Sequence, residues 1–178
     1  EEAKGALVLV HGRGAAAQSM LALVEVIEQA LQNGPHKGKM TYLLPQAHNY
    51  TWYPNTFLAI LDQNEPYLSQ SLGTLGEVLA MLAAAGIPAS RAVLAGFSQG
   101  ACLASEYAAR HPRRYGGLFV LSGALMGPAT ASRAYPGSLA GTPVFVGGCD
   151  HDSWVTEAQL RMTADTLTRL GAEVQIEV

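Results

Sequence analysis

Residues 92–100, AVLAGFSQG, are a short apolar run that ends in a serine held between two glycines. Residues 92–95 have the length and apolarity of a buried strand, and a helical pattern follows from Gln99 to Arg110. Ser98 therefore stands at a tight turn from strand to helix. Such a turn strains the backbone of the serine and requires glycine on both sides, because larger side chains would collide. The G-x-S-x-G pattern in this context predicts a nucleophile elbow with an exposed hydroxyl.

The same alternation of apolar runs and helical patterns extends along the whole chain. Strands are predicted at 6–10, 40–44, 92–95, 118–121, 144–146 and 173–178. Helices are predicted at 18–32, 67–85, 99–110 and from Thr156 to Gly171, the last with a capping box between Thr156 and Gln159. Residues 46–66, with two prolines and four aromatic residues, form an ordered excursion. This order predicts an α/β fold, a mostly parallel sheet with helices on both faces and a site at the carboxyl ends of the strands.

Length and composition exclude several classes of protein. The chain has 178 residues, which fits one domain, and it is 49% hydrophobic and 14% charged, which excludes disorder. No apolar stretch is long enough for a membrane span. A net charge of −3 without a large basic cluster argues against nucleic acid as a partner. Cys102 and Cys149 are too few for a disulfide framework, so we expect a reduced, cytoplasmic protein. The sequence leaves open whether the protein forms a homodimer.

The two ends of the sequence carry a further expectation. Residue 1 is Glu rather than Met, and the sequence stops inside the strand predicted at 173–178. A domain seldom ends on the last residue of a core strand. We therefore expect residues 1–178 to be a single domain that is truncated at its C-terminus, with the natural protein continuing beyond Val178.

A serine nucleophile needs an oxyanion hole, and two backbone N–H groups are candidates. The first belongs to Gln99, the residue after the nucleophile, and the second to Arg13 in the glycine-rich loop His11-Gly12-Arg13-Gly14 that follows the first strand. The Arg13 side chain is expected to be solvated. The loop also fits a dinucleotide-binding G-x-G-x-x-A pattern, but the second strand ends without the acidic residue that such a site requires.

An acid that orients the catalytic base is expected after the next-to-last strand. Asp150 and Asp152 both lie there, on either side of His151. The Asp-His-Asp triplet is a weak candidate for a metal site, because three ligands on one loop lack further acidic residues nearby. A turn-forming role is an ordinary alternative for Asp150.

The chain resembles the phospholipase/carboxylesterase family of α/β hydrolases, which also contains acyl-protein thioesterases. Four groups of residues carry the resemblance along essentially the whole chain in addition to the 96–100 elbow: 11–14, Trp52-Tyr53, 121–123 and 147–155. The resemblance implies that Asp152 is the acid of a Ser-His-Asp triad. Both prolines of the family pattern around this aspartate are replaced, by Ser153 and Thr156, which keeps Asp150 as an alternative.

The resemblance also implies a histidine in a loop after the last strand, yet no histidine follows His151. The base is therefore expected just beyond Val178, with His151 and His48 as weaker alternatives. Trp52 and Phe57 are expected in the wall of the substrate pocket, although aromatic residues of a loop fill a core equally often. These expectations describe a serine carboxylesterase that acts on a small ester without metal or cofactor. A thioesterase or lysophospholipase would use the same residues, and a non-catalytic binding domain is the alternative of a different class.

Overall fold

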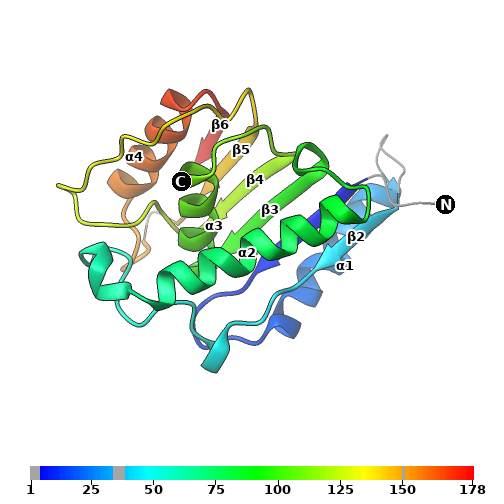
Figure 1. The fold of residues 1–178 in the computed structure, drawn as a ribbon, viewed down its shortest axis with the longest axis horizontal. Helices are drawn as coiled ribbons and strands as arrows, with labels where there is room; N and C mark the ends of the chain where they lie inside the picture. Colours follow the sequence, from blue (N-terminus) through cyan, green and yellow to red (C-terminus); the bar gives the residue numbers. More distant parts are fainter. Residues whose placement is uncertain (1–4, 34–38, 150) are drawn as a thin grey trace.

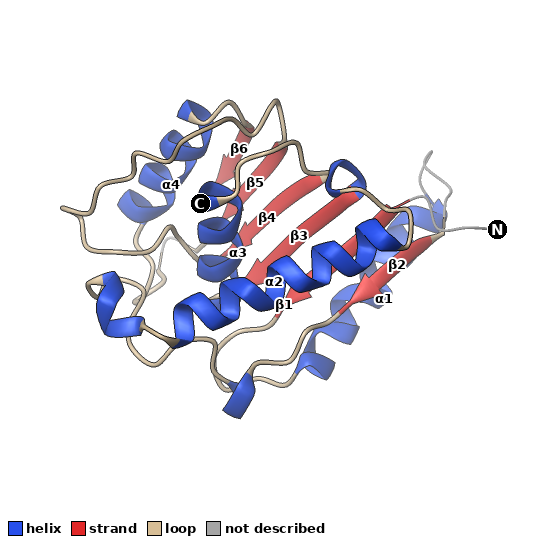
Figure 2. Cartoon of the chain, in the orientation of Figure 1, coloured by secondary structure: helices blue, strands red, loops and turns tan. Residues whose placement is uncertain are grey.

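Six strands form one sheet in the computed structural model, which describes residues 5–33, 39–149 and 151–178. They are β1 (Gly5–Val10), β2 (Met40–Leu43), β3 (Ala92–Phe97), β4 (Gly117–Leu121), β5 (Pro143–Gly147) and β6 (Glu173–Glu177). All neighbouring strands are parallel, in the order β2-β1-β3-β4-β5-β6 (Figure 2). The six predicted strands and the parallel sheet are confirmed.

The sheet order places the loops after β1 and β3 side by side. These two strands are neighbours, and Val10 near the end of β1 is in register with Gly96 on β3. His11, which follows β1, and Ser98, which follows β3, therefore lie at the same edge of the sheet. This edge is formed by the carboxyl ends of the strands, where α/β proteins bind their ligands.

Four α-helices cover the sheet unequally: α1 (Leu21–Asn33), α2 (Tyr67–Ala84), α3 (Gln99–Arg110) and α4 (Glu157–Arg169). Figure 1 shows α2, α3 and α4 in front of the sheet and α1 behind it. Successive side chains of β1 point to opposite faces of the sheet. Val8 belongs to the core under the three front helices, whereas Leu7 and Leu9 pack with residues of α1 behind the sheet. Helices on both faces were predicted and are present.

The face behind β4 and β5 is open in the described part of the chain. Phe97 is 50% exposed and Phe119 is 43% exposed, and the Phe119 and Phe145 rings lie 6.0 Å apart on this face. Parallel sheets are normally covered on both faces. Of the described helices, α1 alone packs here, and its apolar contacts are with β1, β2 and β3.

The long segment between β2 and α2 is ordered, as predicted. It contains two short 3-10 helices, His48–Tyr50 and Leu61–Asn64. Trp52 and Tyr53 between them are each only 2% exposed, and the hydroxyl of Ser71 on α2 donates to the Trp52 carbonyl at 2.6 Å. The segment is therefore part of the core rather than a free loop.

Local sequence patterns place the helix ends well. The capping box predicted before α4 is present: the N–H of Gln159 donates to the Thr156 hydroxyl at 3.4 Å, and the N–H of Thr156 donates to the Gln159 side chain at 2.8 Å. The first predicted helix differs at its start, where residues Ala17–Met20 form a 3-10 turn before α1. A fourth short 3-10 helix, Ala89–Arg91, precedes β3.

Candidate active site

Ser98 occupies a strained turn between β3 and α3. Its backbone angles are φ 53° and ψ −119°, a conformation that non-glycine residues rarely adopt. The flanking glycines are required by contact: a methyl group at Gly96 would lie 2.3 Å from the Gly100 carbonyl oxygen, and one at Gly100 would lie 2.2 Å from the Val10 carbonyl oxygen. This is the turn that the sequence predicts, and it brings the start of α3 directly onto the end of β1.

The Ser98 side chain opens into a cavity of about 430 Å³. Its hydroxyl forms no hydrogen bond with any residue that the structure describes. The wall is formed by residues from five separate parts of the chain, namely Arg13, Tyr53, Pro54, Asn55, Thr56, Phe57, Gln99, Cys102, Ser122, Trp154 and Val155. None of the described residues in this wall carries a carboxylate. An uncharged apolar group is therefore a better occupant of this cavity than a cation.

The glycine-rich loop after β1 lies against the elbow. A methyl group at Gly12 would sit 3.4 Å from Ser98 Cβ, so the two segments are in contact. The loop is held by the N–H of Gly14, which donates to the Tyr50 carbonyl at 2.7 Å. In the described part of the chain, the N–H groups of Arg13 and Gln99 donate to no other group. The oxyanion role expected of these two N–H groups therefore has no competing described partner and stays a prediction.

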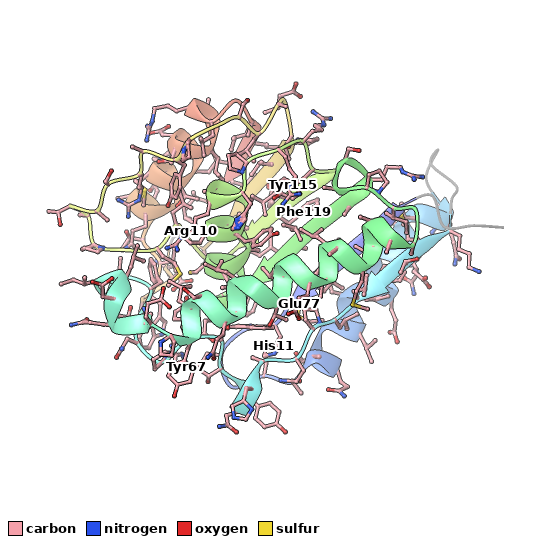
Figure 3. All side chains as sticks on the ribbon, viewed as in Figure 1. His11, Tyr67, Glu77, Arg110, Tyr115 and Phe119 are labelled. Atoms are coloured by element: carbon pink, nitrogen blue, oxygen red, sulfur yellow. The ribbon has the colours of Figure 1, made fainter. Side chains whose placement is uncertain are left out.

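His11 supports this loop from below. It is fully buried at the carboxyl end of β1, in the lower half of the view in Figure 3. Its Nε2 atom accepts the N–H of Ala47 at 3.1 Å, and Nδ1 lies 2.8 Å from the Gly12 carbonyl oxygen, which fixes a neutral ring with the proton on Nδ1. Both ring nitrogens are engaged, so His11 is a structural residue.

None of the other described histidines lines the cavity. His48 lines a second cavity of about 420 Å³ between the 46–54 segment and α2. His111 stacks on Tyr107 at the end of α3, and burial together with the nearby arginines lowers its pKa. His151 is exposed and outside the cavity wall. His36 lies outside the described residues.

Asp152 lies beside the cavity with one carboxylate oxygen occupied. Its Oδ1 atom accepts the N–H of Trp154 at 2.7 Å and the N–H of Val155 at 3.1 Å. These two hydrogen bonds shape the turn that places Trp154 and Val155 in the cavity wall. No described residue bonds to the other oxygen, Oδ2, so this atom can accept a hydrogen bond from a further donor. Asp150, the alternative acid, lies outside the described residues.

The aromatic residues expected in the pocket wall divide between two places. Phe57 lines the cavity next to Ser98. Trp52 does not: it is buried beneath the glycine-rich loop, where its indole N–H donates to the His11 carbonyl at 2.8 Å. Ser122, which the sequence analysis does not assign to the wall, enters it through a turn with φ 51°. Residues 121–123 belong to the groups that carry the family resemblance, but that resemblance alone does not mark Ser122 as a wall residue.

The Arg13 side chain is exposed, as expected, yet its guanidinium is also bonded to the protein. It donates three hydrogen bonds to the carbonyl oxygens of Tyr53, Pro54 and Asn55, at 2.6–2.9 Å. The guanidinium is therefore attached to the segment that forms one side of the cavity. Sequence reasoning missed this contact because its partners are backbone atoms about 40 residues away.

Cys102 reaches the cavity from α3, one helical turn after Ser98. Burial raises its pKa to about 11, so the thiol is protonated and unreactive at neutral pH. The phenol of Tyr53 contacts this thiol, and burial raises the Tyr53 pKa as well. Both groups act as neutral wall residues.

The structure shows neither a metal cluster nor a membrane helix within the residues that it describes. No three described His, Cys, Asp or Glu side chains are arranged to hold a metal ion. No described helix is both long and apolar enough to cross a membrane.

Comparisons with known proteins agree with this geometry. A phospholipase/carboxylesterase from Dyadobacter fermentans is 38% identical, with a TM-score of 0.86 over 98% of this chain and 80% of its own. A SOBER1 variant from Arabidopsis thaliana (18% identity, TM-score 0.76, 97% of this chain and 87% of its own) shares the fold, as does a Bacillus cereus carboxylesterase (20%, 0.72, 99% and 81%).

No curated protein sequence matches the chain significantly. The family model described as Phospholipase/Carboxylesterase matches residues 1–178, the whole sequence. The relationship extends over the elbow, the glycine-rich loop and the strand order alike. The chain belongs to the phospholipase/carboxylesterase family of α/β hydrolases.

Proposed function

We propose that the protein is a serine carboxylesterase that uses Ser98 as its nucleophile. One observation carries the proposal: the strained serine opens into an apolar cavity beside two backbone N–H groups that have no other described partner. Nucleophile and oxyanion donors at one point are the arrangement that acyl transfer requires.

The reaction proceeds in two balanced steps. In the first, Ser98 Oγ bonds to the ester carbonyl carbon, its proton passes to a base, and the carbonyl oxygen becomes an oxyanion held by the N–H groups of Arg13 and Gln99. Collapse of this intermediate breaks the bond to the leaving alcohol, which takes the proton from the base. Water then adds to the acyl-enzyme in the same manner, releasing the carboxylic acid and restoring Ser98.

The base in this proposal is a histidine that lies beyond Val178, oriented by Asp152. The described histidines support this choice by their positions, since none lines the cavity. The geometry of Asp152 supports its role, because backbone N–H groups bind Oδ1 and leave Oδ2 to accept a hydrogen bond from an imidazole N–H. Asp150 remains the second candidate for the acid.

The cavity favours an ester with an uncharged, apolar acyl group. Tyr53, Phe57 and Val155 supply apolar surface, and Cys102 contributes a neutral thiol. A thioester would fit the same wall and the same oxyanion donors. We therefore expect hydrolysis of p-nitrophenyl butyrate, and parallel assays with butyryl thioesters measure the preference for oxygen or sulfur.

The test uses protein expressed from the complete reading frame. Ser98→Ala should lower kcat by at least about 1,000-fold, and Asp152→Asn by at least about 100-fold, with Asp150→Asn close to wild type. Ser105→Ala is the matched control, because this serine lies on the same helix with its hydroxyl bonded to the Cys102 carbonyl. Ester hydrolysis that survives Ser98→Ala would refute the proposal.

A further inference from the structure

The side chains of Arg13 and Gln99 meet at a single atom. Arg13 Nη2 donates to the carbonyl oxygen of Tyr53 at 2.9 Å, and Gln99 Nε2 donates to the same oxygen at 2.8 Å. The two residues are 86 positions apart, Arg13 in the loop after β1 and Gln99 at the start of α3. They are also the two residues whose backbone N–H groups stand beside Ser98.

Each of the two side chains makes further bonds to the same short segment, residues 52–55. Arg13 also donates from Nη1 to the Pro54 carbonyl at 2.9 Å and from Nη2 to the Asn55 carbonyl at 2.6 Å. Gln99, which is 6% exposed, accepts the N–H of Trp52 on its Oε1 atom at 3.0 Å. Arg13 is exposed, so its attachment depends on three adjacent carbonyl acceptors together rather than on the strength of any one bond.

The 52–55 segment is itself fixed to the rest of the molecule. The Trp52 carbonyl accepts the Ser71 hydroxyl of α2 at 2.6 Å, and the N–H of Asn55 donates to the Asn64 side chain at 2.8 Å. Because Ser71 and Asn64 are buried, they hold the 52–55 segment in a fixed position. The two residues that carry the oxyanion N–H groups are therefore both bonded to the same fixed carbonyl, that of Tyr53.

We propose that the side chains of Arg13 and Gln99 are positioning groups, which set the distance between the two oxyanion N–H groups by binding the Tyr53 carbonyl. The inference rests on the proposed function, in which these N–H groups stabilise the tetrahedral intermediate. Their position matters because a displacement of about 1 Å at a reacting centre lowers the rate by about 100-fold. The side chains act through the backbone and do not touch the substrate carbonyl.

Substitution of these side chains keeps both backbone N–H groups and removes only their attachment. Arg13→Met retains an apolar stem without donors, and Gln99→Met retains the length of the amide side chain. We expect kcat for p-nitrophenyl butyrate to fall by about 10- to 100-fold in each variant while KM changes by less than about threefold. The double variant should fall by less than the product of the single effects, because both act through one carbonyl.

Arg114→Met is the matched control. Arg114 also donates from its guanidinium to two backbone carbonyls, those of Ala140 and Gly141. None of these three residues lines the cavity. Loss of the Arg114 guanidinium should leave kcat unchanged. A purely structural role for Arg13 would resemble this control, lowering the melting temperature and leaving the kcat of the folded protein intact.

Chemical rescue provides the second readout. In Arg13→Ala, methylguanidinium at tens of millimolar should restore part of kcat, whereas methylammonium should not, since only the planar fork can reach adjacent carbonyls. An active wild type with unchanged kcat in Arg13→Met and Gln99→Met would overturn the positioning proposal alone. A wild type from the complete reading frame without ester hydrolysis would overturn the proposed function and this proposal with it.

Discussion

Two glycine-to-alanine substitutions should change the free energy of unfolding in opposite directions. Gly100 and Gly73 both lie in helices, where alanine is intrinsically favoured by about 0.5–1 kcal/mol. At Gly73 a methyl group meets no heavy atom within 4 Å. Gly73→Ala should therefore stabilise the protein by about 0.5–1 kcal/mol.

At Gly100 the same methyl group meets the backbone. It would lie 2.2 Å from the Val10 carbonyl oxygen and 2.5 Å from the His11 carbonyl oxygen, against about 3.4 Å for ordinary contact. An overlap of about 1 Å with main-chain atoms cannot be relieved by a rotamer change, so α3 or the loop after β1 must move. Overpacking of this kind costs about 1–3 kcal/mol or more, which outweighs the gain in helix propensity.

Urea denaturation followed by circular dichroism measures both effects. With a slope of about 2 kcal/mol per molar urea, Gly100→Ala should lower the midpoint by about 0.5–1.5 M, and Gly73→Ala should raise it slightly. The kcat of a folded Gly100→Ala protein should also fall, since the elbow and the oxyanion loop share this contact. A Gly100→Ala variant with wild-type stability and activity would refute the close packing of α3 on β1.

Three further predictions concern stability. Glu106→Leu should lower the free energy of unfolding, measured in urea, by about 3 kcal/mol. The Tyr135 hydroxyl and the N–H of Met126 both donate to this buried carboxylate and would lose their acceptor. An equally stable variant would show that water replaces the carboxylate as their partner. Burial raises the Cys102 pKa from 9.0 to about 11. Between pH 9 and 11 the thiol therefore stays protonated in the folded state and loses its proton in the unfolded state. The free energy of unfolding falls across this window as a result. From pH 8 to pH 10, Cys102→Ala should therefore lose about 1 kcal/mol less stability than wild type, and equal losses would contradict the assignment. Thr156→Ala removes the hydroxyl of the capping box and should cost about 1 kcal/mol, measured by thermal unfolding, whereas an unchanged melting temperature would show that the cap contributes nothing.

The parts of the site that local sequence dictates could be predicted. The strained turn at Ser98 follows from its two flanking glycines, because only that residue type avoids the backbone overlap measured at Gly96 and Gly100. The capping box at Thr156 is likewise a contact between residues three positions apart. In both cases the sequence contains every partner of the interaction within a few residues.

Contacts to distant backbone atoms could not be predicted. Every residue has a carbonyl oxygen, so nothing in the sequence marks those of residues 53–55 as the acceptors for Arg13. The same limit applies to Trp52, whose aromatic ring was expected in the pocket wall but packs under the glycine-rich loop. Which way a side chain of an irregular segment faces depends on the folded path of that segment, and periodicity does not encode this path.

The identity of the nucleophile is the central claim, and covalent labelling tests it most directly. The protein from the complete reading frame is incubated with a fluorophosphonate, digested, and analysed by mass spectrometry. If Ser98 is the nucleophile, the wild type carries a single phosphonate adduct on Ser98 and Ser98→Ala carries none. An adduct on another residue, or equal labelling of wild type and Ser98→Ala, would contradict it.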